Sequence, residues 1–209
     1  MKRFVTLCCV LATLAAGVCA QDGARRPAPQ LSGAPMPLNH GGKIETAYDG
    51  FARETVVSLK RMSVTCEAGR GMESRFKNLC IRLEAVLHCP GKQLEYVRRA
   101  TLRLTFEAKD WDARHSPNER QLSAVADGET IQLGTLRLVK QEAGEGWFDN
   151  RMKEVLELSV PYAAFERLAR AQFVELAVGR TSFALRDKNV AALRDLNSRV
   201  LVSAKQARQ

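Results

Sequence analysis

The feature that most constrains the fold of this chain is the alternation of apolar and polar residues between positions 99 and 108. Successive side chains of a strand point to opposite faces of a sheet, so this period of two predicts a strand with one buried and one solvated face. Residues 79–87 alternate in the same way, and Pro90-Gly91-Lys92 separates the two segments. We expect them to be antiparallel neighbours.

A second hairpin is expected further along the chain. Asp127-Gly128 is a strong turn sequence, and it stands between strand patterns at residues 121–126 and 130–139. In the second of these strands the apolar phase shifts across Gly134. A β-bulge at this glycine would explain the shift.

Other segments carry strand patterns as well. Residues 56–64 are a strand candidate with a change of phase near Lys60, and residues 155–160 alternate again. Residues 173–178 and 181–185 are expected to form a short strand pair. The chain therefore contains more strand patterns than helical ones.

Helical patterns come late. Pro161 suits the first turn of a helix, and Asp187 suits the N-cap of a second one. The apolar residues that share a face in these two helices are Tyr162, Phe165, Leu168 and Ala169, then Val190, Leu193, Leu196 and Val200. Strands followed by helices indicate an α+β fold that is mainly β: a single antiparallel sheet or sandwich-like domain with two short helices near the C-terminus.

Composition divides the chain into three segments. A positive start, an uncharged apolar run and small residues near position 20 predict a cleavable secretory signal peptide over residues 1–20. Residues 21–43 are rich in Pro and Gly and are expected to form a disordered tether. Residues 44–205 are expected to fold as a single β-rich globular domain. We expect a periplasmic or secreted protein without a transmembrane segment in its mature chain.

Removal of the leader changes the charge and the cysteine content. Without it, 30 basic residues stand against 23 acidic ones, a net charge of about +7, and the remaining cysteines are Cys66, Cys80 and Cys89. An oxidising compartment permits one disulfide among three cysteines. Cys80 and Cys89 would lie about 30 Å apart along one continuous strand, which excludes a bond between them.

The expected disulfide joins Cys66 to Cys80, with Cys89 free. These two cysteines would face each other across the mouth of the loop between residues 56–65 and 79–87. Cys66 is in phase with apolar residues and Cys80 with charged ones, so they share a face only if a bulge intervenes. A Cys66–Cys89 disulfide is the first alternative, and the absence of any disulfide is the second.

Five short motifs resemble those of a group of uncharacterised exported bacterial domains. They are Tyr48-Asp49-Gly50-Phe51, Glu54-Thr55-Val56-Val57-Ser58-Leu59, Pro90-Gly91-Lys92, Ala126-Asp127-Gly128 and Val174-Glu175-Leu176-Ala177-Val178-Gly179. The resemblance covers nearly all of residues 47–199 and includes the final Leu-rich helix. It implies no known activity, substrate or catalytic residue.

Residues suited to catalysis or metal binding are few. The sequence contains no P-loop, no serine-hydrolase elbow, no zinc-protease motif and no C-x-x-C pair. The densest cluster of potential ligands is Asp110, Asp112, His115 and Glu119. A calcium loop that begins at Asp110 would need glycine at its sixth position, where His115 stands. We expect a polar connection there and no cofactor; a hydrolase with a non-standard site at these residues is an alternative.

The basic charge suggests a polyanion such as nucleic acid, lipopolysaccharide or cell wall as a second alternative. Such a binder would need one unbroken positive face made by Arg82, Arg98, Arg99 and Arg103. Acidic residues lie on the same strand faces as these arginines: Glu84 is in phase with Arg82, and Glu107 is in phase with Arg99 and Arg103. That interleaving favours a solvated sheet face with cross-strand ion pairs.

Aromatic residues give a further indication of how the chain functions. Phe106, Phe165, Phe173 and Phe183 fall in core phase, and Trp111 and Trp147 lie in expected loops as the plausible exposed rings. An exposed loop ring could contact a partner, although it could also fold back over the core. The sequence predicts an exported, non-catalytic domain that acts by interaction with an unidentified protein or envelope component.

Overall fold

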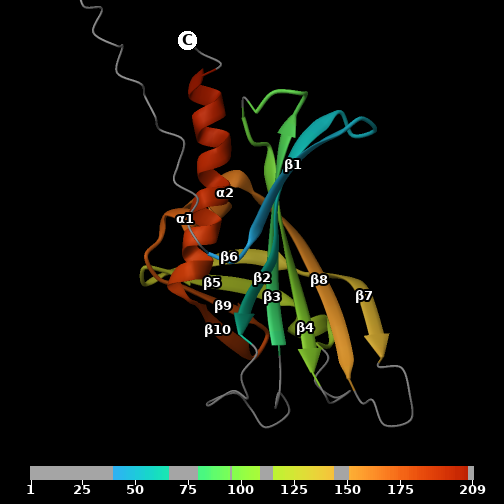
Figure 1. The fold of residues 1–209 in the computed structure, drawn as a ribbon. Helices are drawn as coiled ribbons and strands as arrows, with labels where there is room; N and C mark the ends of the chain where they lie inside the picture. The colour runs from blue at the N-terminus through green and yellow to red at the C-terminus, as the bar shows by residue number, and fades with distance from the viewer. Residues whose placement is uncertain (1–39, 66–79, 95, 109–114, 144–150, 207–209) are drawn as a thin grey trace, which may run out of the picture. The chain divides into compact units, whose positions relative to one another are not determined.

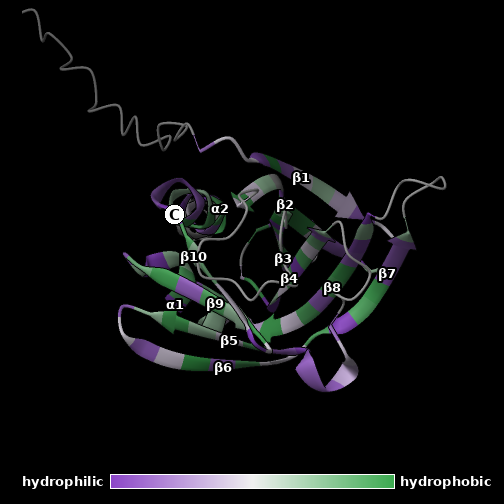
Figure 2. Cartoon of the chain, turned by 90° about the horizontal axis from the view of Figure 1, so that it is seen from below, coloured by the Kyte–Doolittle hydropathy of each residue, from purple (hydrophilic) through white to green (hydrophobic). Residues whose placement is uncertain are grey.

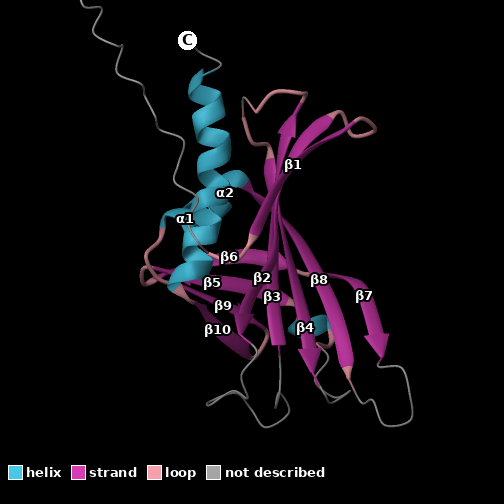
Figure 3. Cartoon of the chain, viewed as in Figure 1, coloured by secondary structure: helices cyan, strands magenta, loops and turns pink. Residues whose placement is uncertain are grey.

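The computed structural model describes residues 40–65, 80–94, 96–108, 115–143 and 151–206, all of which fall within one compact unit, Pro35–Gln209. Most of these residues lie in strands (Figures 1 and 3). The strands are β1 (Lys43–Asp49), β2 (Glu54–Thr65), β3 (Cys80–Pro90), β4 (Arg99–Ala108), β5 (Gln121–Ala126), β6 (Glu129–Thr135), β7 (Arg137–Ala143), β8 (Met152–Pro161), β9 (Val174–Val178) and β10 (Thr181–Leu185). The helices are a short 3-10 turn (Pro117–Glu119), α1 (Tyr162–Arg170) and α2 (Asp187–Gln206).

The strands form two antiparallel sheets. The large sheet has the order β1-β2-β3-β4-β8-β7, and the small sheet has the order β10-β9-β5-β6. Leu136 alone separates β6 from β7, so one length of chain leaves the small sheet and enters the large one. The mainly β, α+β fold class expected from the alternating patterns is confirmed.

Strands β3 and β4 pair as predicted, because their apolar positions meet on the same face. Leu83 lies opposite Leu104, and Ala85 lies opposite Leu102. All four side chains are buried, while the residues between them face outward. Figure 2 shows this alternation as changes of colour along the strands. Burying one face of each strand stabilises the pair by roughly 25 cal/mol per Å² of apolar surface.

Two predicted irregularities are present. Leu122 pairs with Gly134 and Ser123 with Gln132, so Leu133 is an extra residue and the bulge lies at the predicted glycine. Gly134 has φ of +132°, a backbone conformation that L side chains rarely adopt. The phase change near Lys60 is a second register shift, which lies between Leu59 and Met62.

The hairpin turn at Asp127-Gly128 is also confirmed. Both residues have positive φ, +50° and +87°, as a type I′ turn requires. The Asp127 carboxylate accepts the backbone N–H groups of Gln172 and Phe173, and thereby fixes the chain just before β9. The core position expected for Phe173 is wrong: its ring is 49% exposed, because β9 begins at Val174 and points its even-numbered residues inward.

Both helices occur where their apolar stripes predicted them. Phe165, Leu168 and Ala169 of α1 are buried, as are all four expected stripe residues of α2. The second helix has 20 residues and is not short, and Asp187 is its first residue. The N-terminal capping contact comes from Asn189, whose side-chain oxygen accepts the N–H of Arg186. Helix α2 contacts both β2 and β10, and so joins the two sheets.

The folded part begins earlier than the expected boundary at Ile44. His40 is buried, and its Nε2 lies 3.1 Å from the Asp195 carboxylate in α2. Its Nδ1 accepts the backbone N–H of Gly42, which leaves the proton of the neutral ring on Nε2. A Cβ on Gly42 would meet the side chain of Leu59 at 2.6 Å, so any larger residue here requires Leu59 to shift. Residues 40–43 therefore belong to the fold and not to the tether.

Candidate interaction site at one end of the large sheet

The turn between β1 and β2 is held in a defined conformation. The Asp49 side chain accepts the backbone N–H of Phe51 at 2.8 Å and that of Ala52 at 3.1 Å. Such an aspartate turn is a local alternative to sheet hydrogen bonds. Arg53 completes the turn with φ of +53°, a left-handed conformation that costs a non-glycine residue about 1 kcal/mol. Hydrogen bonds within the turn therefore fix the backbone conformation of the hairpin tip.

Three aromatic side chains are exposed at this end of the large sheet. Phe51 is fully exposed, and Tyr48 and Tyr96 are 45% and 57% exposed. Tyr96 belongs to the connection between β3 and β4, which reaches the same end as the β1–β2 turn (Figure 1). Large apolar side chains that share one exposed end are typical of a contact surface. We call this region the aromatic end.

The β3–β4 connection is tied to the β1–β2 turn. The N–H of Gly91 donates to the carbonyl of Arg53 at 2.9 Å, and the Thr55 hydroxyl donates to the carbonyl of Gly91 at 2.8 Å. The ammonium group of Lys92 lies 5.6 Å from the centre of the Tyr48 ring, within the range of a cation–π contact. The two connections thus form one surface and not two independent loops.

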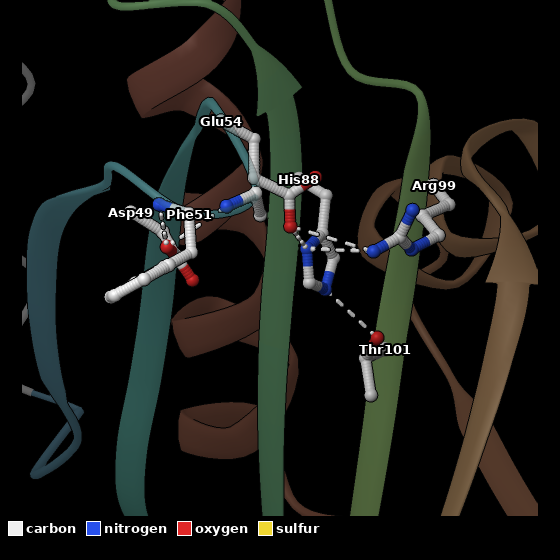
Figure 4. A network of polar contacts seen from close by, with 7 residues as sticks. Asp49, Phe51, Glu54, His88, Arg99 and Thr101 are labelled. Atoms are coloured by element: carbon white, nitrogen blue, oxygen red, sulfur yellow. Dashed lines mark hydrogen bonds and ion pairs between the residues drawn. The ribbon is translucent and has the colours of Figure 1, made fainter.

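A polar network lies next to the turn, on the outer face of the sheet (Figure 4). Nδ1 of His88 is 2.6 Å from the Glu54 carboxylate, and Nε2 is 2.9 Å from the Thr101 hydroxyl. Because a carboxylate only accepts, Nδ1 of the neutral ring donates to Glu54, and Nε2 accepts from Thr101. A guanidinium nitrogen of Arg99 lies 3.4 Å from the same carboxylate. The network joins β2, β3 and β4 immediately after the turn.

The order of acid, imidazole and hydroxyl is the order used by hydrolases that activate a hydroxyl nucleophile. Such chemistry also needs hydrogen-bond donors for the developing oxyanion. Thr101 lies within β4, which pairs with β3 on one side and β8 on the other, so the backbone N–H groups around it are already used. The arrangement suits the anchoring of the turn better than acyl transfer.

The rest of the outer face is neutralised by ion pairs, as the interleaved charges predicted. Arg103 donates two hydrogen bonds to Glu157, at 3.0 and 2.6 Å, and also lies 3.6 Å from Glu84. Arg82 pairs with Glu107 at 3.5 Å. Burial tends to raise the pKa of Glu157, but hydrogen bonds from its two arginine partners outweigh this and lower it. The unbroken positive face required for a polyanion binder is therefore interrupted.

The expected ligand cluster is not brought together in the described residues. Asp110 and Asp112 lie outside them. His115 is buried, with Nδ1 2.7 Å from the carboxylate of Glu154 on β8. Glu119 accepts the N–H and hydroxyl of Ser116, which is a capping box of the 3-10 turn. Each of the two described residues thus has a structural partner of its own.

Glu154 is the most deeply buried carboxylate of this region, with no exposed surface. It accepts the backbone N–H and ring N–H of His115, and Arg120 lies 3.7 Å from its second oxygen. Removal of one partner would leave a charge in the core, so these groups stabilise one another. Sequence reasoning missed Glu154, because its position in an alternating strand indicates only that it points inward with Leu156.

The cysteine prediction is only partly within the described residues. Cys66 lies outside them, so the expected Cys66–Cys80 disulfide stays a prediction. Cys89 is a buried thiol in β3, in phase with Leu87. Burial raises the pKa of this thiol to about 11, and the charge of Glu54 adds to the effect. Cys89 is therefore poorly suited to be a nucleophile at neutral pH.

The rings found exposed are not the two that the sequence indicated, whose exposure stays a prediction. Trp111 and Trp147 lie outside the described residues. Sequence reasoning missed the aromatic end, although a signal was present: Asp49-Gly50 is a turn sequence, and Phe51 follows it directly. Alternation alone assigns residues to the faces of a sheet and says nothing of a ring at the tip of a hairpin.

Within the described part of the chain, no group of three or more His, Cys, Asp or Glu side chains is arranged to hold a metal ion. No helix there has the length and apolar character needed to cross a membrane. Comparison of the chain with protein-family models, with curated proteins and with solved structures found no match.

Proposed function

We propose that this protein is an exported, non-catalytic domain that binds a component of the cell envelope through its aromatic end. The observation that carries the proposal is the full exposure of Phe51 on a turn whose direction is fixed by Asp49. An apolar ring in water gains about 1.5–3 kcal/mol when it is buried against a partner. A turn whose backbone is already fixed loses little backbone conformational entropy on binding.

Several features support an interaction role over the alternatives. The exposed rings share one end of the sheet with the anchoring network of Glu54 and His88. A hydrolase at the expected cluster loses support, because His115 and Glu119 have separate structural partners. A general polyanion binder loses support, because the arginines in the middle of the sheet face are paired with acids.

Export forms the second part of the proposal. It rests on the leader at residues 1–20, and the compartment is the periplasm or the exterior of the cell. The expected disulfide fits the described strands: Thr65 pairs with Ile81, and Cys66 and Cys80 are the next residue on each side. A register shift between Ser63 and Thr65 supplies the bulge that this pairing requires.

Site-specific cross-linking in the exporting cell tests the interaction. A photoreactive phenylalanine analogue is placed at position 51, and at position 173 as a matched control, since Phe173 is also exposed but lies just before β9 of the small sheet. We expect an adduct with an envelope protein or lipid from position 51 and none from position 173. Equal adducts from both positions, or none from either, would contradict the proposal.

A further inference from the structure

The basic residues at the aromatic end differ from those on the rest of the sheet face. Arg53, Lys92 and Arg98 are all exposed, and among the described residues none of them has an acidic side chain at ion-pair distance. Arg82 and Arg103 in the middle of the sheet face, by contrast, are each paired with glutamate. Positive charge that is not balanced by described acids is therefore gathered where the exposed rings are.

These cations and rings share one frame. Arg53 belongs to the β1–β2 turn, and Lys92 and Arg98 belong to the β3–β4 connection, which the Gly91 N–H joins to the carbonyl of Arg53. The N–H of Arg98 donates to the carbonyl of His88, which fixes the other end of the connection. Asp49, the acid of the turn, accepts two N–H groups of the turn itself, and Glu95 of the β3–β4 connection lies outside the described residues. An external anion thus meets cations that are carried by connections whose backbone is held by hydrogen bonds.

We propose that the aromatic end docks on an anionic phospholipid surface, an inference that rests on the proposed function and names its partner. Amphipathic rings such as tyrosine favour the level of the headgroups, and an apolar ring such as Phe51 enters the boundary of the acyl chains. Cations beside an anionic surface each add an attraction that corresponds to about a fivefold gain in binding. The aromatic end supplies the rings for insertion, one phenylalanine and two tyrosines, and three cations for the electrostatic attraction.

The arrangement fits a membrane better than other polyanions or a small ligand. A single-stranded nucleic acid needs a positive track with rings along it, and the sheet face below the aromatic end is neutralised by ion pairs. A small ligand needs a concave apolar pocket, whereas Phe51 is fully exposed at the tip of a hairpin. A planar anionic surface needs only a protruding ring with cations around it.

Sedimentation of the purified mature protein with vesicles tests the inference. One vesicle is pure phosphatidylcholine, and the other contains about 30 mol% phosphatidylglycerol as the anionic lipid. We expect binding to the anionic vesicle and little to the neutral one. Phe51→Ala should weaken binding about tenfold. Lys92→Ala should weaken it about fivefold.

Matched controls separate this contact from general adhesion. Phe173→Ala removes another exposed ring, and Arg180→Ala removes an exposed cation in the turn between β9 and β10. Both variants should bind as the unchanged protein does. Arg53→Gly removes a cation and also the left-handed strain, so it should bind more weakly while folding at least as stably.

The outcomes distinguish this inference from the proposed function. Absence of binding to anionic vesicles, or equal losses in the Phe51 and Phe173 variants, would overturn the lipid contact. If position 51 still forms an adduct with a polypeptide in the exporting cell, the proposed interaction stands and its partner is a protein. If position 51 forms no adduct at all, the proposed function fails as well.

Discussion

The carboxylate of Glu54, the first residue of β2, lies 2.6 Å from Nδ1 of His88 in β3. The two residues are 34 positions apart in the sequence, and Glu54 immediately follows the turn that carries Phe51. Glu54 is 8% exposed and also lies 3.4 Å from Arg99, so its buried carboxylate has two polar partners in place of water. The stability of the fold and the presentation of the aromatic end thus depend on the same hydrogen bond.

Glu54→Ala is expected to lower the free energy of unfolding by about 1–3 kcal/mol, because it leaves His88 and Arg99 without their acceptor. Chemical denaturation followed by circular dichroism measures the change. Arg98→Ala is the matched control, since Arg98 is exposed and should change stability by less than about 0.5 kcal/mol. Equal effects of the two substitutions would show that the Glu54 network does not stabilise the fold.

The N-terminal boundary can be tested at His40. A chain shortened to begin at residue 44 is expected to lose about 1–3 kcal/mol, because Asp195 in α2 keeps its buried carboxylate but loses the imidazole. A chain that begins at residue 39 should keep its full stability. Thermal unfolding of the two shortened chains measures the difference. Identical midpoints would show that residues 40–43 do not stabilise the fold.

Glu157 is expected to make the free energy of unfolding depend on pH in the acid range. Its folded-state pKa is lowered from 4.5, so its two arginine partners stabilise the protein fully above that pH, and the contribution is lost as the pH falls through the lowered value. Glu157→Gln should cost about 1 kcal/mol at pH 7 and make the acid limb of the stability curve shallower. A variant whose loss of stability is the same at pH 7 and pH 3 would contradict this assignment.

The three cysteines outside the leader are expected to form one disulfide and leave one buried free thiol. Non-reducing peptide mapping of the protein recovered from its native cell should find Cys66 joined to Cys80, and a Cys66–Cys89 peptide would contradict this pairing. Cys89, buried and with its pKa raised to about 11, should resist alkylation near pH 8 until the protein is denatured. Rapid labelling in the native protein would instead indicate that β3 opens around this residue.

The strands and their irregularities could be predicted because the sequence records them locally. Alternation of apolar residues gave the pairing of β3 with β4, and the positive φ needed at Gly128 and Gly134 is favourable for glycine. The exposure of Phe173 could not be predicted in this way. It depends on the Asp127 carboxylate, 46 positions away in sequence, which holds the chain before β9 begins.

The candidate site was less predictable for a related reason. Glu54, His88 and Thr101 come from three strands, and nothing in the spacing of these residues indicates that they meet. Likewise, Glu154 and His115 are 39 positions apart and meet only when β8 and the segment before the 3-10 turn are packed together. Contacts between distant segments depend on tertiary packing, which alternation does not encode.

The most direct test of the interaction at the aromatic end compares oxidative footprints of the protein in the intact envelope and after purification. Hydroxyl radicals modify aromatic rings in proportion to their exposure. Phe51, Tyr48 and Tyr96 should be modified several-fold less in the envelope than in the purified protein, while Phe173 should be modified equally in both states. Equal modification of Phe51 in the two states would contradict the account, because a ring that binds a partner must lose its contact with water.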